Sequence, residues 1–290
     1  MLGILSLLSR LPFWFWYAVS DVLAWVAGDL IAYRKNVITQ NLQRSFPDKS
    51  LEELARIRRA FYRNLSDVIV ETIKAIRMSE ADFRARVHYP NPELVNDLMK
   101  NHDTLLIMTA HQCNWEWMLL SGKIQATVPL HGVYQELSNP SSEKLMRYIR
   151  GRFGADPVKR SDLGRLIVKQ RQSKRIYALV ADQTPRPRED KVWHTFLNQP
   201  TAFITGAERL AKMMQAPVVF AGMQRLKRGH YQITLTALAL PPYQKKEDLQ
   251  LLENFAQITE KTIVEHPSDW LWSHRRWKLK VSDENTTPNT

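Results

Sequence analysis

The sequence of 290 residues contains one cysteine, ten glycines and no long uncharged apolar run. A single cysteine excludes an internal disulfide framework and any cysteine-rich zinc module. No Gly-x-Gly-x-x-Gly or P-loop pattern occurs, so the chain offers no recognisable cradle for nucleotide phosphates. A polytopic membrane protein is excluded, because only one stretch approaches the apolarity of a membrane span. With 44% hydrophobic and 24% charged residues, the chain has the composition of a folded globular protein.

The charge balance is strongly basic. The chain has 41 lysines and arginines against 29 acids, which gives a formal net charge of +12. Such a charge predicts attraction to an anionic membrane, an acidic protein or nucleic acid. The alternative is a solvated surface whose charge serves only solubility. The cations are scattered and no zinc finger, RNP sequence or basic zipper accompanies them, so no nucleic-acid partner is expected.

An apolar N-terminal stretch contains the aromatic cluster Phe13–Tyr17 and is interrupted by Asp21 and Asp29. Each acid near the centre of a membrane span costs about 2.5–3.5 kcal/mol, so a clean span is disfavoured. Clustered aromatic side chains favour the headgroup region, and Arg34 and Lys35 follow at positions where they can meet anionic lipids. We expect an interfacial helix or a short anchor with the main body on the cytoplasmic side. The alternative is a buried core helix.

Helical and strand-like patterns alternate through the rest of the chain. Apolar spacing predicts a long amphipathic helix over 51–76, with Ser50 and Glu53 as its capping box. Further helices are expected at 92–100, 114–123, 140–153, 162–172, 205–214 and 246–265. Strands are expected at 104–109, 131–134, 175–181, 217–221 and 231–239. This alternation predicts an α/β fold with a central mixed, mostly parallel sheet flanked by helices.

The most informative segment follows the buried strand 104–109 and includes His111 and Glu116. In α/β proteins, ligands and catalytic groups lie where strands end and helices begin. Five residues on one continuous helix are about 140° apart, so the two side chains meet only if His111 lies in the preceding turn. Glu116 would then accept a hydrogen bond from the imidazole and fix its tautomer, and His111 would act as a general base.

The His-x4-acid pattern, completed by Asn114-Trp115-Glu116, resembles the late acyltransferases of bacterial lipid A biosynthesis, and the resemblance covers nearly the whole chain. Its other elements are the apolar N-terminus and the segments 139–154, 181–183, 206–211, 216–219 and 272–278. The resemblance implies a glycerolipid-acyltransferase-like arrangement of the sheet. One departure is Cys113, where many relatives have glycine.

Transferred position by position, the resemblance makes His111 the general base and Glu116 the residue that orients it. Arg150 matches a family arginine suited to clamp a phosphate or carrier, and Asp182 would pair with Arg150 or orient the acceptor sugar. Asn114 is included among the substrate-binding residues, although a turn-shaping role is the alternative. A surface arginine and a helix cap are the structural alternatives for Arg150 and Asp182.

Three other features have weaker chemical readings. Cys113 lies beside His111, but a buried inert thiol is the expected interpretation rather than a covalent nucleophile. His274, with Arg275 and Arg276, would bind lipid phosphates or form a solvated basic end. No third ligand accompanies His111 and Glu116 at metal-binding spacing, so neither a metal nor a cofactor is expected.

These observations predict three segments: a membrane-associated region over 1–35, an acyltransferase domain over 36–282 and a polar tail over 283–290. The expected enzyme moves a fatty acyl chain from acyl carrier protein, or acyl-coenzyme A, to a hydroxyl of a lipid A precursor. It would work at the cytoplasmic face of the inner membrane, in contact with anionic lipids. A phospholipid, aminolipid or glycolipid acceptor is the alternative, and a non-enzymatic basic membrane-surface adaptor is a second one.

Overall fold

The computed structural model describes residues 2–170, 173–244, 248 and 250–281, so the expected tail 283–290 lies outside the described residues. Its strands are β1 (Val87–His88), β2 (Thr104–Thr109), β3 (Leu130–Tyr134), β4 (Asp156–Lys159), β5 (Arg175–Val180), β6 (Lys191–Phe196), β7 (Gln199–Ile204), β8 (Val218–Lys227) and β9 (His230–Ala239). Its α-helices are α1 (Leu2–Leu8), α2 (Phe13–Trp25), α3 (Lys35–Ser45), α4 (Leu51–Lys74), α5 (Glu80–Arg86), α6 (Glu93–Asn101), α7 (Trp115–Gln125), α8 (Pro140–Arg150), α9 (Leu163–Lys169), α10 (Gly206–Met214) and α11 (Leu251–Glu265).

Seven strands form one sheet in the order β1-β9-β8-β2-β5-β3-β4. The five strands from β8 to β4 are mutually parallel, whereas β9 is antiparallel to β8 and β1 runs parallel to β9. The predicted α/β fold with a mixed, mostly parallel sheet is therefore confirmed. Because the parallel strands share one direction, the segments that follow β2, β5, β3 and β4 all lie at the same edge of the sheet.

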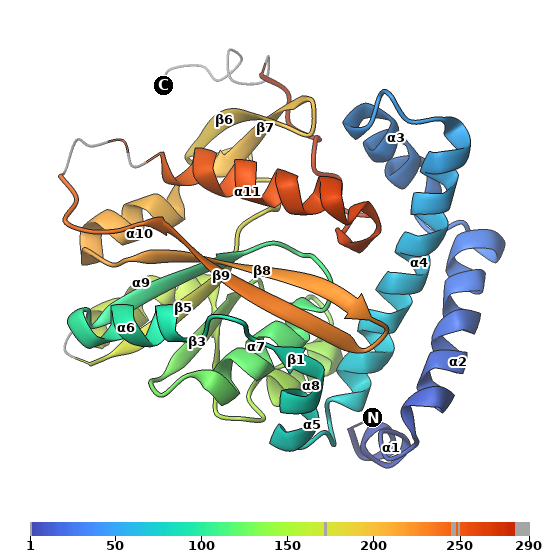
Figure 1. The fold of residues 1–290 in the computed structure, drawn as a ribbon, viewed down its shortest axis with the longest axis horizontal. Coiled ribbons are helices and arrows are strands. Elements are labelled where there is room, and N and C mark those ends of the chain that lie inside the picture. Colours follow the sequence, from blue (N-terminus) through green and yellow to red (C-terminus); the bar gives the residue numbers. More distant parts are fainter. Residues whose placement is uncertain (1, 171–172, 245–247, 249, 282–290) are drawn as a thin grey trace.

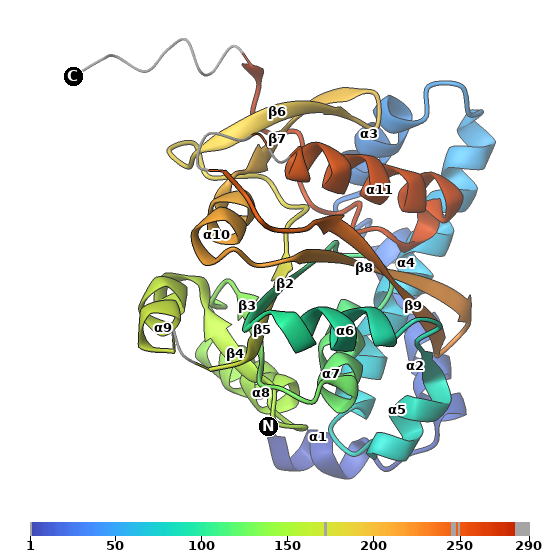
Figure 2. The same cartoon turned by 60° about the vertical axis from the view of Figure 1, so that its left-hand side comes forward.

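Helices cover both faces of this sheet (Figure 1). The helices contribute to two buried apolar clusters. One cluster contains side chains of α9, α10 and α11, and the other contains side chains of α5, α6 and α7. Figure 2 shows α11 and the β6–β7 hairpin on one side of the sheet and α6 and α7 on the other. The antiparallel β6–β7 pair was not predicted from the sequence, and it adds Phe196 and Phe203 to the first cluster.

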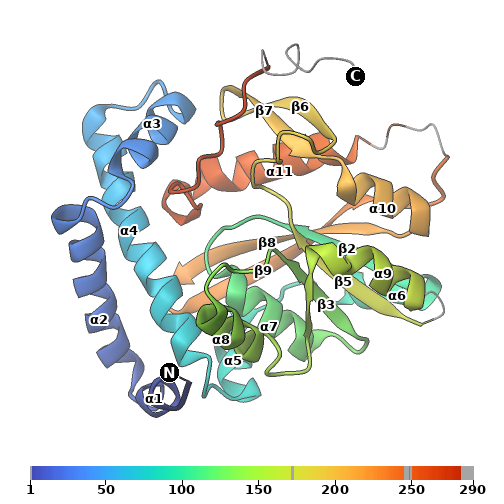
Figure 3. The same cartoon turned by 180° about the vertical axis from the view of Figure 1, so that it is seen from behind.

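Local sequence signals explain the long helix beside the sheet. Ser50 and Glu53 form the predicted capping box of α4, with the Ser50 hydroxyl accepting from the Glu53 N–H at 3.2 Å. The Asn64 amide of α4 donates to Asp269 Oδ1 at 2.8 Å, and this hydrogen bond connects the helix to the C-terminal segment. Viewed from behind, β8 runs toward α4, so this helix closes the edge at which the parallel strands end (Figure 3).

The N-terminal helix α2 lies along α4 and shows two different faces. Trp16 and Ser20 are buried, and the Ser20 hydroxyl donates to Asp67 at 2.6 Å. On the other side Trp14 is 72% exposed and Trp25 is 56% exposed. The buried-core reading therefore describes one face of the helix, and the other face leaves large aromatic side chains exposed; the interfacial reading stays a prediction.

Within the described residues, no single helix combines the length and apolarity that a bilayer crossing needs. Only α1 taken together with the continuous helix 13–30 meets that requirement, and this pair is bent by 116°.

Candidate functional site

The segment between β2 and α7 forms a sharp turn that carries His111. Cys113 has a φ of +52°, in the left-handed region that favours glycine. Its N–H donates to the carbonyl of Asp269 at 2.8 Å, and the His111 carbonyl accepts from the N–H of Leu271 at 3.1 Å. The C-terminal segment thus holds the turn on both sides. His111 lies in the turn before the helix, as the spacing required.

The imidazole of His111 faces Asp182, which follows β5 directly. Nδ1 of His111 lies 2.7 Å from Asp182 Oδ1, and the His111 N–H donates to Oδ2 at 3.0 Å. The indole N–H of Trp270 also donates to Oδ2, at 2.8 Å. Asp182 is 3% exposed, and burial alone would raise its pKa. The charge and hydrogen bonds of His111, with the Trp270 N–H, outweigh burial and lower the pKa of Asp182 to about 2.

An ionised Asp182 determines the tautomer of the neutral imidazole. A carboxylate only accepts hydrogen bonds, so Nδ1 must carry the proton that lies between the two groups. Nε2 then carries a lone pair that can accept a hydrogen bond. It faces the side-chain amide of Gln183 at 3.3 Å, and the His111 side chain retains 19% of its exposure. A basic nitrogen is therefore oriented and accessible at the edge of the sheet.

Glu116 has a different partner from the one the sequence suggested. Its carboxylate accepts two hydrogen bonds from Arg150, from Nε to Oε2 at 2.8 Å and from Nη2 to Oε1 at 2.6 Å. The predicted hydrogen bond between Glu116 and the imidazole is therefore wrong, because the carboxylate is turned toward α8. The predicted pairing of Asp182 with Arg150 is wrong for the same reason, since each acid is occupied elsewhere.

Arg150 is fixed in two ways. Besides the Glu116 fork, its guanidinium lies 5.0 Å from the centre of the Tyr134 ring. Burial lowers the pKa of Arg150, but the bonded Glu116 carboxylate outweighs burial and raises it. Its Nη1 is buried and has no hydrogen-bond partner among the described residues. A buried N–H without a partner is costly, so this donor is available for an anionic group of a substrate.

Asn114 is buried, and its side chain is hydrogen-bonded within the fold. Its side-chain oxygen caps α7 by accepting from the Trp117 N–H at 2.9 Å, and its amide donates to Glu71 at 2.7 Å. Asn114 is 0% exposed, and its assignment as a substrate-binding residue stays a prediction. The two hydrogen bonds agree with the turn-shaping alternative.

Cys113 is also buried. Its thiol donates to the Met223 carbonyl at 3.1 Å, and burial holds the pKa of the thiol far above its ordinary value. A thiolate nucleophile is thereby disfavoured, which agrees with the inert interpretation.

In the C-terminal basic segment, Arg276 is buried and His274 is partly buried. Arg276 is 1% exposed, and its Nη2 donates to the Ala202 carbonyl at 2.7 Å. Burial lowers the pKa of Arg276 to about 10 and that of His274 to about 4. A solvated basic end is therefore wrong for Arg276, whereas phosphate binding by His274 stays a prediction. Arg275 and Lys278 are exposed.

Sequence reasoning missed Trp270 as a partner of Asp182 and left the role of Gln183 open. Trp270 lies 88 residues after Asp182, and no spacing pattern connects them. Gln183 offers a weak signal, because it directly follows the acid at the end of a buried strand. No group of three metal-ligating side chains exists among the residues that the structure describes.

The sequence was compared with known proteins. The family model described as bacterial lipid A biosynthesis acyltransferase matches residues 1–279. A lipid A biosynthesis lauroyltransferase of Escherichia coli K12 is 24% identical over 281 residues, which cover 96% of this chain and 90% of the relative. A lipid A biosynthesis acyltransferase of Haemophilus influenzae is 26% identical over 87% of this chain and 80% of the relative. A lipid A biosynthesis palmitoleoyltransferase of E. coli K12 is 21% identical over 98% and 92%.

Proposed function

Because the chain belongs to the bacterial lipid A biosynthesis acyltransferase family and is therefore an acyltransferase, we propose that it transfers a fatty acyl chain to a hydroxyl of a lipid A precursor. The donor is a thioester, of acyl carrier protein or of coenzyme A. The observation that carries this proposal is the pairing of His111 with the buried carboxylate of Asp182 at the carboxyl edge of the sheet, which leaves Nε2 unprotonated and accessible.

In the proposed reaction, Nε2 of His111 accepts the proton of the acceptor hydroxyl in place of its long contact with Gln183. The hydroxyl oxygen attacks the thioester carbonyl, and a tetrahedral oxyanion forms. When the oxyanion collapses, the carbon–sulfur bond breaks and the leaving thiolate takes the proton from the imidazolium. Asp182 stabilises the imidazolium throughout, as the acid of a catalytic triad does. The net products are an ester and a free thiol.

Arg150 and Glu116 have a second role in this proposal. Glu116 does not touch the imidazole; it fixes the guanidinium by the two-bond fork. Arg150 then presents its unpaired Nη1 N–H, which supports stabilisation of developing negative charge or of a substrate phosphate. Glu116 is thus a positioning residue in this account, and the catalytic base depends on Asp182.

Membrane association is part of the proposal. The first 33 residues leave many large apolar side chains exposed, namely Ile4, Leu7, Leu8, Trp14, Val22, Leu23, Trp25, Leu30, Ile31 and Tyr33. Exposed apolar surface of this kind marks sites that bind membranes or partners, and tryptophan and tyrosine favour the headgroup region. We propose attachment to the cytoplasmic face of the inner membrane, supported by attraction between the +12 charge and anionic lipids. The same charge suits an acidic acyl carrier protein.

The test uses the purified full chain with an acyl thioester and a lipid A precursor, and mass spectrometry of the product. The expected result is a mass increase of one acyl chain that depends on His111. A mass-spectrometric comparison of lipids from a deletion strain and its parent identifies the acceptor in cells. Loss of an acyl chain from a phospholipid, aminolipid or other glycolipid, with lipid A unchanged, would contradict the proposed acceptor.

A further inference from the structure

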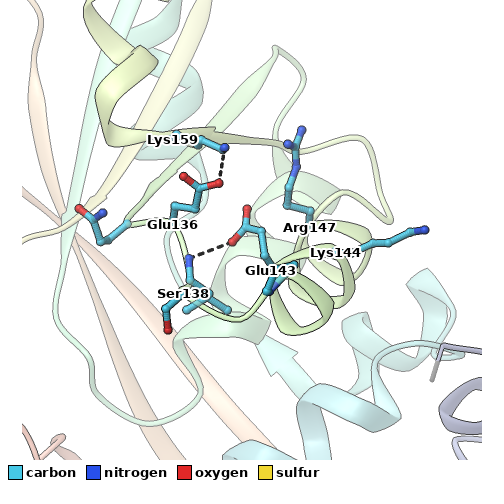
Figure 4. Close-up of a pocket in the computed structure, with 9 residues that line it drawn as sticks. Glu136, Ser138, Glu143, Lys144, Arg147 and Lys159 are labelled. Carbon is cyan, nitrogen blue, oxygen red and sulfur yellow. Dashed lines mark hydrogen bonds and ion pairs between the residues drawn. The ribbon is translucent and has the colours of Figure 1, made fainter.

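A polar pocket of about 730 Å³ lies beside the site, at the carboxyl ends of β3 and β4 and the start of α8 (Figure 4). Only two of the nine lining residues, Leu137 and Pro140, are apolar. The remaining seven are charged or polar, and they include the cations Lys144, Arg147 and Lys159. Three cationic side chains in the wall suit a ligand that carries negative charge better than an uncharged acyl chain. The wall suits a polar ligand.

Both acids of the pocket are already engaged. The carboxylate of Glu143 accepts from the Tyr134 hydroxyl and, at 3.0 Å, from the Leu137 N–H. The carboxylate of Glu136 pairs with Lys159. The side chains of Arg147 and Lys144, by contrast, form no hydrogen bond within the described residues, and both are exposed; the charge of Arg147 also acts on Glu143. The groups left free to bind a ligand are therefore cationic, and an anion is the ligand class that they favour.

The pocket is connected to the site through one side chain. Tyr134 is the last residue of β3; its ring lies under the Arg150 guanidinium, and its hydroxyl holds Glu143. Neighbouring strands are about 4.8 Å apart, so β4 lies about 14 Å from β2, which ends beside His111. A ligand whose anionic group occupied the pocket would have to extend along the strand ends to reach the imidazole.

We propose that this pocket holds the phosphate of the acyl donor's phosphopantetheine arm, with Arg147 and Lys144 as its cationic contacts. The inference rests on the proposed function, because it assumes a thioester donor. A phosphopantetheine arm joins a phosphate to a thioester through a long polar linker with two amides, which matches a polar, cation-lined pocket at a distance from the base. Gln135 and Ser138 line the same wall and offer hydrogen-bonding groups to such a linker. Acyl carrier protein and coenzyme A share this arm.

The experiment measures kcat/KM for thioesters of one acyl chain: acyl-pantetheine, acyl-phosphopantetheine, acyl-coenzyme A and acyl carrier protein. Wild type and the double variant Lys144→Ala/Arg147→Ala are compared. The matched control is Arg56→Ala/Arg59→Ala, which removes two exposed cations from α4 and lowers the net charge equally. The KM for the acceptor lipid is measured in parallel.

We expect wild type and control to prefer acyl-phosphopantetheine to acyl-pantetheine by about tenfold or more, since hydrogen bonds to charged groups contribute about 1.5–3 kcal/mol. In the pocket variant this preference should fall to near one, with the acceptor KM unchanged. Acyl-coenzyme A and acyl carrier protein should lose efficiency by a similar factor.

Three results would overturn the inference. The first is a pocket variant that keeps the phosphate preference. The second is a rise in the acceptor KM alone, which would assign the pocket to an acceptor phosphate. The third is a loss of kcat/KM confined to acyl carrier protein, which would mean that the cations bind the surface of the carrier and not its phosphopantetheine arm. A wild-type enzyme that transfers from no thioester would instead contradict the proposed function, so the two failures are distinguishable.

Discussion

Glu71 and Asp182 are both buried carboxylates held by donors from several elements, yet their surroundings differ in kind. Glu71 is fully buried and accepts from the Asn114 amide, the Tyr231 hydroxyl and the Tyr17 hydroxyl. Its burial raises its pKa despite the charge of Arg225 nearby. Asp182 faces an imidazole that still reaches solvent, and its pKa is lowered.

This difference distinguishes a carboxylate that holds parts of the fold together, Glu71, from one that orients an imidazole, Asp182. The donors around Glu71 join the N-terminal helix α2, the long helix α4, the cap of α7 and strand β9, and none of them has a free face toward the site. Around Asp182, one donor has an accessible second nitrogen whose protonation the acid controls. Substitutions near Glu71 should therefore affect stability first, whereas substitutions near Asp182 should affect activity first.

The largest expected effect is the loss of transfer activity on changing the His111–Asp182 pair. His111→Ala removes the base, and Asp182→Asn allows the wrong tautomer, so each should lower kcat by about 10²–10⁴-fold. Steady-state kinetics tests this, with circular dichroism at neutral pH to verify that the variants are folded. Near-normal activity of purified His111→Ala would remove general base catalysis from the account.

A smaller loss is expected at Arg150. Arg150→Ala should lower kcat by about 10²–10³-fold if its free Nη1 stabilises a developing charge. Arg150→Lys should not restore the rate, because lysine keeps the charge but cannot form the two-bond fork with Glu116. Kinetics of both variants across a salt series checks this. Wild-type-like curves for Arg150→Lys would place the residue in the diffuse basic surface instead.

Next in size is the effect on stability at Glu71. Glu71→Ala removes an acceptor from three buried donors and should destabilise the fold by about 2–4 kcal/mol, whereas Tyr17→Phe should cost about 1 kcal/mol. Urea unfolding measures both. The specific activity of the folded fraction should stay close to wild type, and a kcat loss like that of Asp182→Asn would erase the distinction between the two acids.

The same contacts bear on the predicted segment 1–35. Removing α2 would remove the hydrogen bonds from Ser20 to Asp67 and from Tyr17 to Glu71. We therefore expect deletion of residues 1–32 to destabilise the whole domain and also to weaken membrane attachment. The sequence predicted a membrane-associated region over 1–35 distinct from an acyltransferase domain over 36–282. A truncated chain as stable as the full one would support that division and contradict the expected destabilisation.

The fold was largely predictable because it follows from local patterns. Alternating buried runs and amphipathic spacings place β2 and α6 within a residue or two of where they lie, and the capping box marks the start of α4. The β6–β7 hairpin escaped prediction, since its strands lack a clear turn signal.

The partners within the site were not predictable in the same way. His111 and Asp182 are 71 residues apart, and only the parallel pairing of β2 with β5 brings them together. The spacing of His111 and Glu116 suggested a local pair, but the direction of the Glu116 side chain is decided by Arg150 on another helix. Local spacing pointed to His111 and Glu116, the family resemblance pointed to Arg150 and Asp182, and tertiary packing assigned their partners.

A pH effect of about 2–3 kcal/mol is expected from Asp182. Because its folded pKa, about 2, lies below the ordinary unfolded value of about 3.9, its ionised form stabilises the fold above that value. This contribution is lost as the pH falls from about 4 through 2. The difference in unfolding free energy between wild type and Asp182→Asn should therefore shrink over that range. A pH-independent difference would contradict the strong pairing with His111.

The smallest effect is expected at Cys113. Its thiol is buried and bonded to a carbonyl, so Cys113→Ser should keep near-wild-type activity. Cys113→Gly should also be active, because glycine adopts the positive φ of this position without strain. Activity assays of the purified variants check both. If Cys113→Ser were as inactive as His111→Ala, a covalent route through the thiol would have to replace the proposed one.

The central claim is that Asp182 keeps the proton of neutral His111 on Nδ1 and leaves Nε2 free to accept a proton. Nitrogen-15 chemical shifts of the imidazole in histidine-labelled protein measure this directly, with the spectrum of His111→Ala assigning the resonances. The account predicts a protonated Nδ1 and an unprotonated Nε2 in the neutral wild-type imidazole, and a mixture of tautomers in Asp182→Asn. A wild-type imidazole protonated on Nε2, or one that is unchanged in Asp182→Asn, would contradict it.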